Sequence, residues 1–269
     1  MKLVRLGAVN YLNVRPLVFG LERRHDLVSL RFDPPAECAR LLASGEIDLG
    51  MVPSITYLDR PGDGIVPGVC IGSDGAVDSV ALFLRRPIRE VRTLAVDTSS
   101  RTSVMLTRIL CARRFDIAPT FVPHPPDLPA MLAKADGALL IGDPALFADH
   151  RGLGVEKIDL GLEWTTMTGL PFVWAFWAGR LDSVSPDVVG VLQEAAEQGH
   201  VHIDTIAAAY SADPERQATA RRYLRESLVF RLTPRAVDGL RAYFTAAREL
   251  GLATGDPTLR FFPSEGERE

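Results

Sequence analysis

The stretch LGAVNYLNVRPLVFGL, residues 6–21, contains the pattern that decides the fold. It continues an apolar run that begins near residue 2, and such a run predicts a buried strand. Asn10 and Asn13 then interrupt the apolar residues. Pro16 suits the first turn of a helix, where a missing N–H costs nothing. A strand, a polar turn and a helix in this order indicate the start of a βαβ unit.

The same alternation of short apolar runs and helical patterns continues along the chain. Further strands are expected at residues 27–33, 47–53, 120–124 and 172–180, with two β-like runs within 64–86. Residues 93–115 are expected to form a strand, a polar loop and a long helix, and residues 137–148 a strand that turns into a helix. Other helices are expected at residues 16–24, 35–46, 128–136, 185–203, 212–228 and 233–252, with a further helical turn at 54–60. Strands that alternate with helices predict an α/β fold with a mostly parallel sheet.

Two strand-rich blocks with similar beginnings predict two lobes. The first lobe is expected to comprise residues 1–86 and 175–269, and the second residues 87–174. No Gly/Ser-rich linker marks either crossing, which favours paired strands acting as a hinge. Two lobes place a ligand cleft between them, faced by helix N-termini from both sides.

Composition excludes several classes of partner. The chain has 269 residues and a net charge of −4, and its 30 Lys and Arg are scattered among 34 Asp and Glu, so we expect no nucleic acid partner. No run approaches about 18 apolar residues, so no membrane span is expected. We expect no secretory signal, because the apolar run in residues 1–9 is short and contains Arg5. Cys38, Cys70 and Cys111 form no CxxC pair and fit a reducing compartment, which predicts a cytoplasmic protein.

Polar loops recur at the carboxyl ends of the predicted strands, where open α/β sheets bind ligands. Hydroxyl groups beside a helix N-terminus attract anions, because the free N–H groups and the helix dipole both favour negative charge. Arg101 adds a planar fork for a carboxylate. These junctions suit a small molecule with one or two carboxylates. The candidate substrate-binding residues are Ser54, Ser79, Ser99, Ser100, Arg101, Thr102, Ser103, Gly142, Asp143, Thr168 and Gly169.

Each of these candidates also has a structural explanation. The hydroxyls of residues 99–103 can cap a helix, and Asp143 followed by Pro144 is typical of a cap and first helical residue. Arg101 can pair with a nearby carboxylate. Asn10 and Asn13 are harder to explain in this way, because Asn is a poor strand residue and a buried amide needs several partners. We therefore expect at least one of them to face a ligand.

Cofactor and metal motifs are missing from the sequence. It contains no HExxH, no cysteine-based zinc spacing, no GxSxG, no GxxxxGK[ST] and no GxGxxG. His200 and His202 are two residues apart in a helical pattern, so they lie on different faces. We expect no metal and no cofactor, and any catalysis must come from side chains, backbone dipoles and the substrate.

Six stretches in order resemble the chorismate dehydratases, which act first in the futalosine route to menaquinone. They are GAVNYLNVRPL, GEIDLGMVPSITYL, SDGAVDSVALF, DTSSRTSVMLTRILC, ALLIGDPAL and TGLPFVWAFW. The resemblance implies the two-lobed fold of type II periplasmic binding proteins, used as a cytoplasmic enzyme. It also implies a carbon–oxygen lyase that converts chorismate, a dicarboxylate, to 3-[(1-carboxyvinyl)oxy]benzoate and water without a cofactor.

By this resemblance the critical amide of the family corresponds to Asn13, the last residue of NYLN, which becomes the candidate catalytic residue. A neutral amide is not a credible general base near pH 7. Our hypothesis is that Asn13 orients the substrate or the departing hydroxyl, while the enolpyruvyl carboxylate of the substrate collects the ring proton. Ser79 and residues 99–103 would hold carboxylates. Asn10 is not a fixed part of the pattern and carries less weight.

Two other functions stay open at this stage. The sister enzyme, 1,4-dihydroxy-6-naphthoate synthase, has the same fold but tends to open with a Ser-Pro-Cys-Pro-Asn-like segment, where this chain has GAVNYLN. A non-catalytic binding protein for a small aromatic carboxylate is the rival from another class, since the fold hosts both binding and catalysis.

Overall fold

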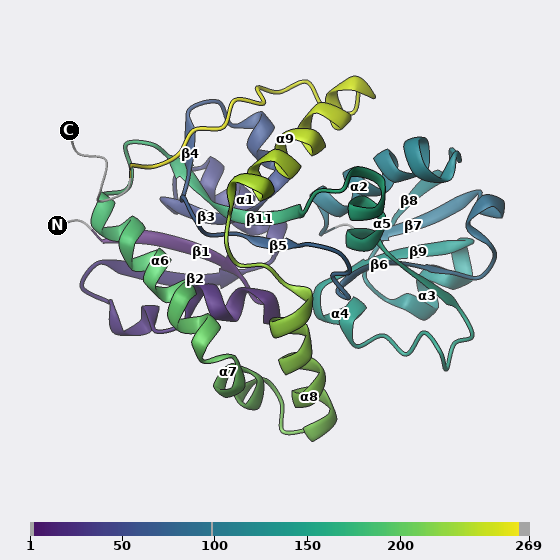
Figure 1. Cartoon of the computed structure of the whole chain (residues 1–269), viewed down its shortest axis with the longest axis horizontal. Coiled ribbons are helices and arrows are strands. Elements are labelled where there is room, and N and C mark those ends of the chain that lie inside the picture. The colour runs from purple at the N-terminus through teal and green to yellow at the C-terminus, as the bar shows by residue number, and fades with distance from the viewer. Residues whose placement is uncertain (1–2, 98, 264–269) are drawn as a thin grey trace.

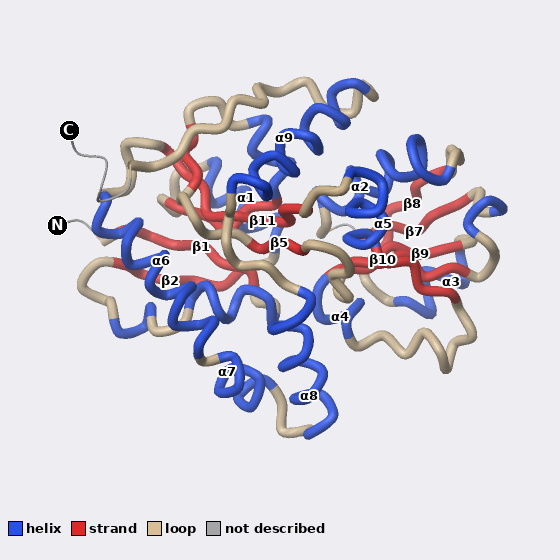
Figure 2. Tube along the Cα trace, in the orientation of Figure 1, coloured by secondary structure: helices blue, strands red, loops and turns tan. Residues whose placement is uncertain are grey.

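The computed structural model describes residues 3–97 and 99–263, so Thr98 of the predicted anion loop lies outside the described residues. Two β-sheets lie side by side along the long axis of the molecule, with helices packed around both (Figures 1 and 2). The α/β fold expected from the sequence is confirmed.

The first sheet has six strands in the order β2-β1-β3-β11-β4, with β5 pairing with β11. Strands β1 and β2, and β1 and β3, are parallel, whereas β11 runs antiparallel to its neighbours. Its strands are β1 (Val4–Val9), β2 (Val28–Asp33), β3 (Leu49–Pro53), β4 (Asp63–Ile65), β5 (Ile71–Ser73) and β11 (Phe172–Arg180).

The second sheet has five strands in the order β10-β6-β9-β7-β8. Its strands are β6 (Val80–Leu84), β7 (Thr93–Asp97), β8 (Thr120–His124), β9 (Gly137–Ile141) and β10 (Glu156–Asp159). The chain passes from the first sheet to the second and back again, and both passages come earlier in the sequence than predicted. The chain enters the second sheet between β5 and β6 rather than after residue 86, and it has returned to the first by Phe172 rather than residue 175.

Nine α-helices pack around the sheets within the described residues. They are α1 (Pro35–Ala43), α2 (Arg101–Leu110), α3 (Leu128–Lys134), α4 (Gly142–Leu146), α5 (Leu160–Thr168), α6 (Pro186–Val201), α7 (Ile203–Tyr210), α8 (Pro214–Arg222) and α9 (Pro234–Glu249). Four of them start with proline at the first turn after a polar cap residue, as the fixed φ of proline favours. None of the helices in these residues is long and apolar enough to cross a membrane.

Short helices of other types complete the fold. The 3₁₀ segments are η1 (Leu12–Val18), η2 (Leu21–Arg23), η3 (Ser54–Asp59) and η4 (Ile88–Glu90), and the π-helical turns are η5 (Cys111–Phe115) and η6 (Tyr223–Ser227). The predicted helix that starts at Pro16 is wrong in detail, because η1 begins at Leu12 and contains Pro16. Gly199 of α6 packs so closely on the backbone of Pro16 that a Cβ would not fit there.

Asp159 fastens the chain where it enters the second sheet. Its carboxylate caps α5 by accepting from Leu162 N at 3.0 Å, and it also accepts from Val77 N at 3.0 Å and Asp78 N at 2.6 Å. The sequence analysis predicted neither β10 nor α5, which lie between residues 156 and 168. These contacts hold the crossing segment, including Ser79, in a fixed position beside the second sheet.

Candidate active site

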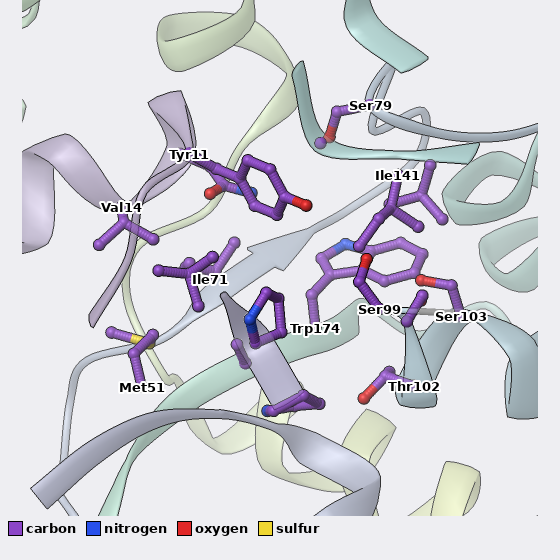
Figure 3. Close-up of a pocket in the computed structure, with 18 of the residues that line it drawn as sticks. Tyr11, Val14, Met51, Ile71, Ser79, Ser99, Thr102, Ser103, Ile141 and Trp174 are labelled. Atoms are coloured by element: carbon purple, nitrogen blue, oxygen red, sulfur yellow. The ribbon is translucent and has the colours of Figure 1, made fainter. Parts of the chain in front are cut away.

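A cavity lies between the two sheets, at the carboxyl ends of β1, β3 and β9 and beside the N-terminus of α2 (Figure 3). The volume of this cavity is about 90 Å³, which is several times the volume that one water molecule needs. Its lining consists of Val9, Tyr11, Asn13, Val14, Pro35, Met51, Pro53, Ile71, Val77, Ser79, Val80, Ser99, Ser100, Arg101, Thr102, Ser103, Ile141, Gly142, Trp174 and Ala175.

The N-terminus of α2 forms one polar wall. Asp97 accepts hydrogen bonds from the backbone N–H of Ser99 at 2.8 Å and from its hydroxyl at 2.6 Å, which fixes the loop after β7. Ser100 is the N-cap residue of α2, yet its side chain makes no capping hydrogen bond. The structure therefore leaves this hydroxyl, next to the positive end of the helix dipole, for another partner.

The next three residues continue this wall. Thr102 and Ser103 are buried, at 4% exposure each, and both line the cavity. Arg101 is exposed at the edge of the cavity, and none of the ion pairs within residues 3–97 and 99–263 includes it. The structural ion pair considered for Arg101 is thus not formed, so its guanidinium is available to an anion.

Asn13 and Ser79 also line the cavity. The Oδ1 atom of Asn13 is buried and has no hydrogen-bond partner among the described residues. The Ser79 hydroxyl is 2.7 Å from the hydroxyl of Tyr223, a residue that sequence reasoning missed. Burial raises the pKa of Tyr223, so it stays protonated, although hydrogen bonds with Ser79 and Asn13 act in the opposite direction. An unsatisfied buried amide oxygen is costly, and a ligand that donates to it removes the cost.

Tyr11 is a second missed residue. Its hydroxyl points into the cavity on the side of Ser99 (Figure 3). Burial raises the pKa of Tyr11, and a hydrogen bond with Ser99 lowers it in part, so the phenol is neutral near pH 7. The ring packs on Gly142, whose φ is +62° and where an added Cβ would lie 3.1 to 3.2 Å from three ring carbons. Gly142 thus fits both its backbone conformation and its neighbour.

Asp143 is not the helix cap that the sequence favours. The N-cap residue of α4 is Ile141, and the helix begins at Gly142. The carboxylate of Asp143 instead accepts from Leu12 N at 3.1 Å and from the Tyr210 hydroxyl at 2.8 Å. Both partners belong to the side of the molecule built on the first sheet, whereas Asp143 follows β9 of the second. The carboxylate therefore joins the two sides next to Asn13.

Besides Asp143, three predicted substrate-binding residues do not line the cavity. Ser54, the first residue of η3, is fully buried behind the wall, and its Oγ is 3.4 Å from Thr102 Oγ1. The Thr168 hydroxyl donates to Trp164 O at 2.9 Å, and Gly169 ends α5 with a φ of +71°. Asn10 is exposed and accepts from Arg15 at 2.6 Å. Of the two asparagines, only Asn13 faces the cavity.

The remaining walls are apolar and were missed because such residues match a core pattern. Examples are Met51, Ile71 and Val77, together with Trp174, whose indole N–H donates to Ser73 Oγ at 3.1 Å. An apolar slot with polar groups at its ends suits a flat ring that carries anionic substituents. Within the part of the chain that the structure describes, no group of three or more His, Cys, Asp or Glu side chains is placed to hold a metal ion.

A sequence model of the menaquinone biosynthesis family matches residues 4–249. The chain belongs to this family. It is 34% identical over 211 residues to the chorismate dehydratase of Thermus thermophilus, and the match covers 72% of this chain and 76% of that protein.

Solved structures show that this chain has the fold of periplasmic binding proteins. The periplasmic aliphatic sulphonate binding protein SsuA of Escherichia coli superposes with a TM-score of 0.66 over 100% of this chain and 96% of its own, at 19% identity. The alkanesulfonate-binding protein SsuA of Xanthomonas axonopodis pv. citri, bound to MOPS, gives a TM-score of 0.68 over 96% of both chains, at 17% identity. The two-lobed fold expected from the sequence is thus confirmed.

Proposed function

We propose that this menaquinone biosynthesis protein is a chorismate dehydratase, which converts chorismate to 3-[(1-carboxyvinyl)oxy]benzoate and water. The observation that carries the proposal is a single cavity lined both by Asn13, whose amide oxygen is unpaired, and by the anion-binding end of α2. The identity of 34% to a chorismate dehydratase supports it.

The arrangement suits the two ends of a dicarboxylate. The N-terminus of α2, with Ser100, Ser103 and the free Arg101, offers donors and positive charge to one carboxylate. Losing one such hydrogen bond costs roughly 1 to 3 kcal/mol, because a charged group is left unpaired. The apolar slot around Trp174 excludes water from the ring.

The chemistry then needs little from the protein beyond orientation. The C–H bond of the ring carbon that carries the enolpyruvyl ether breaks, and the enolpyruvyl carboxylate takes the proton. The electron pair of that bond forms the new ring double bond, and the hydroxyl on the neighbouring carbon leaves. The departing hydroxide and the transferred proton make water. Since the ring becomes aromatic, the driving force lies in the substrate, and positioning supplies the rate.

Asn13 and Ser79 hold the reacting side of the substrate in this account. The amide oxygen of Asn13 accepts a hydrogen bond from the ring hydroxyl and orients the C–O bond that breaks. Ser79 donates to the enolpyruvyl carboxylate. We place the reaction in the cytoplasm, since Cys38, Cys70 and Cys111 are free and buried, as a reducing compartment favours.

Asn13 variants test the assignment. Purified protein is incubated with chorismate in EDTA, and the product is followed by chromatography with mass detection. We expect Asn13→Ala to lose at least a hundredfold in kcat with its melting temperature unchanged, and Asn13→Asp to be strongly impaired. An Asn13→Asp protein as active as the wild type would contradict the orienting role. Chorismate that raises the melting temperature but is never converted would favour the binding-protein alternative.

A further inference from the structure

Tyr223 is a buried polar residue that the proposed mechanism leaves without a task. It is 1% exposed and lies in the π-helical turn η6, about 200 residues after Asn13 in the chain. π-helical turns occur frequently at functional sites. Its hydroxyl lies 2.7 Å from Ser79 Oγ, and hydrogen bonding by the Asn13 side chain acts to lower its pKa, as a donor to the phenol oxygen does. One tyrosine thus contacts both residues that line the reacting side of the cavity.

The hydrogen-bond directions in this group follow from the atoms that are already used. Asn13 Oδ1 has no partner, so the amide can meet Tyr223 only through its NH₂ group, which donates and cannot accept. The phenol oxygen of Tyr223 is therefore an acceptor towards Asn13. Its own proton must go to the Ser79 oxygen, because Ser79 is the other partner within reach.

We call these two hydrogen bonds, from Asn13 to Tyr223 and from Tyr223 to Ser79, the chain of donation. It has one consequence at Asn13 and another at Ser79. At one end the amide of Asn13 is held with its oxygen towards the cavity, where it accepts from a hydroxyl group. At the other end the Ser79 oxygen is already occupied as an acceptor, so its hydroxyl proton is free to donate to an anion. Without Tyr223, the amide of Asn13 can turn and present NH₂ to the substrate hydroxyl instead of oxygen.

We propose that Tyr223 is a positioning residue, which fixes an acceptor on Asn13 and a donor on Ser79 so that the site recognises a hydroxyl next to an anionic group. This inference rests on the proposed function. Chorismate carries its ring hydroxyl and its enolpyruvyl ether on neighbouring carbons, which matches a paired acceptor and donor. The role goes beyond filling space, because it decides which polar atom of each neighbour faces the ligand.

The test compares two buried tyrosines. Tyr223→Phe keeps the ring and removes the hydroxyl. Tyr57→Phe is the matched control, since Tyr57 is 2% exposed and its hydroxyl bonds the backbone of Asp63 and Arg260, away from the cavity. We expect Tyr223→Phe to lower kcat roughly 10- to 100-fold with KM changed less than about threefold. Tyr57→Phe is expected to keep the wild-type kcat.

A double variant asks whether Tyr223 acts through Asn13. In an Asn13→Ala background, Tyr223→Phe is expected to cost less than about threefold, because the amide it positions is gone. Equal losses in both backgrounds, or a wild-type kcat for Tyr223→Phe in the presence of Asn13, would overturn the proposal. A wild-type protein that makes no product from chorismate refutes the proposed function instead, so the two failures are distinguishable.

Ser79→Ala covers the case in which Tyr223→Phe does not fold. It removes the acceptor that fixes the tyrosine proton, so kcat is expected to fall at least tenfold together with a rise in KM. A Ser79→Ala protein with a wild-type kcat would therefore refute the chain of donation.

Discussion

A single added methyl group at Gly142 tests how closely the cavity wall is fitted. Gly142 has a φ of +62°, a left-handed conformation that costs a residue with a Cβ roughly 1 to 2 kcal/mol. Alanine also restricts the unfolded chain, which offsets about 0.4 to 1 kcal/mol of this. The net loss in the free energy of unfolding expected for Gly142→Ala from the backbone is therefore about 1 kcal/mol.

Gly154 separates this backbone strain from contact with the site. Its φ is +63°, it is exposed, and an added Cβ would meet nothing within 4 Å. At Gly142 the same Cβ lies 3.1 to 3.2 Å from the ring of Tyr11, which must shift by a few tenths of an ångström. Since misplacement by about 1 Å costs roughly a hundredfold in rate, this shift should lower kcat/KM about three- to tenfold.

The two alanine variants are compared by urea denaturation and by turnover of chorismate. Both are expected to lose about 1 kcal/mol of stability, and only Gly142→Ala is expected to lose activity. Equal turnover in the two variants would refute the role given to the contact between Gly142 and Tyr11. A stability loss confined to one variant would refute the argument from backbone conformation.

Two further predictions follow from the structure. Asp143→Ala removes the two hydrogen bonds by which this carboxylate joins the two sides of the cleft, so KM for chorismate should rise about tenfold and solution scattering should show a larger radius of gyration. Asp143→Asn should have a smaller effect, and an unchanged KM would contradict this prediction. Burial raises the pKa of Cys38 to about 11 and the pKa of Cys70 and Cys111 to about 12. At pH 8 all three thiols should therefore react with a disulfide reagent only after unfolding. Rapid reaction of the native protein would contradict their burial.

The predictable parts of the site are those where polar residues break an apolar pattern. Asn13 and the hydroxyl groups of residues 99–103 stand out at the ends of strands, and the structure brings them to one cavity. Tyr11 and Trp174 do not stand out, because aromatic residues beside strands also fit a core. Tyr223 lies in a helical tail far along the chain, and only the three-dimensional fold places it beneath Asn13 and Ser79.

The wrong or unsupported predictions share a physical cause. Asp143 before Pro144 has the composition of a helix cap, but tertiary partners across the cleft compete for its carboxylate. Thr168 and Gly169 have the hydroxyl and the freedom of a binding turn, yet these properties serve the end of α5. Local sequence shows which conformations are favourable and cannot show which distant groups arrive there.

The conversion of chorismate by the purified wild-type protein tests the central claim most directly. Chorismate is incubated with the protein in EDTA, with buffer alone as the control, and both are sampled over time by chromatography with mass detection. The account predicts a product lighter than chorismate by one water, formed in proportion to protein concentration and identical in retention to authentic 3-[(1-carboxyvinyl)oxy]benzoate. Chorismate that disappears no faster than in buffer would contradict it.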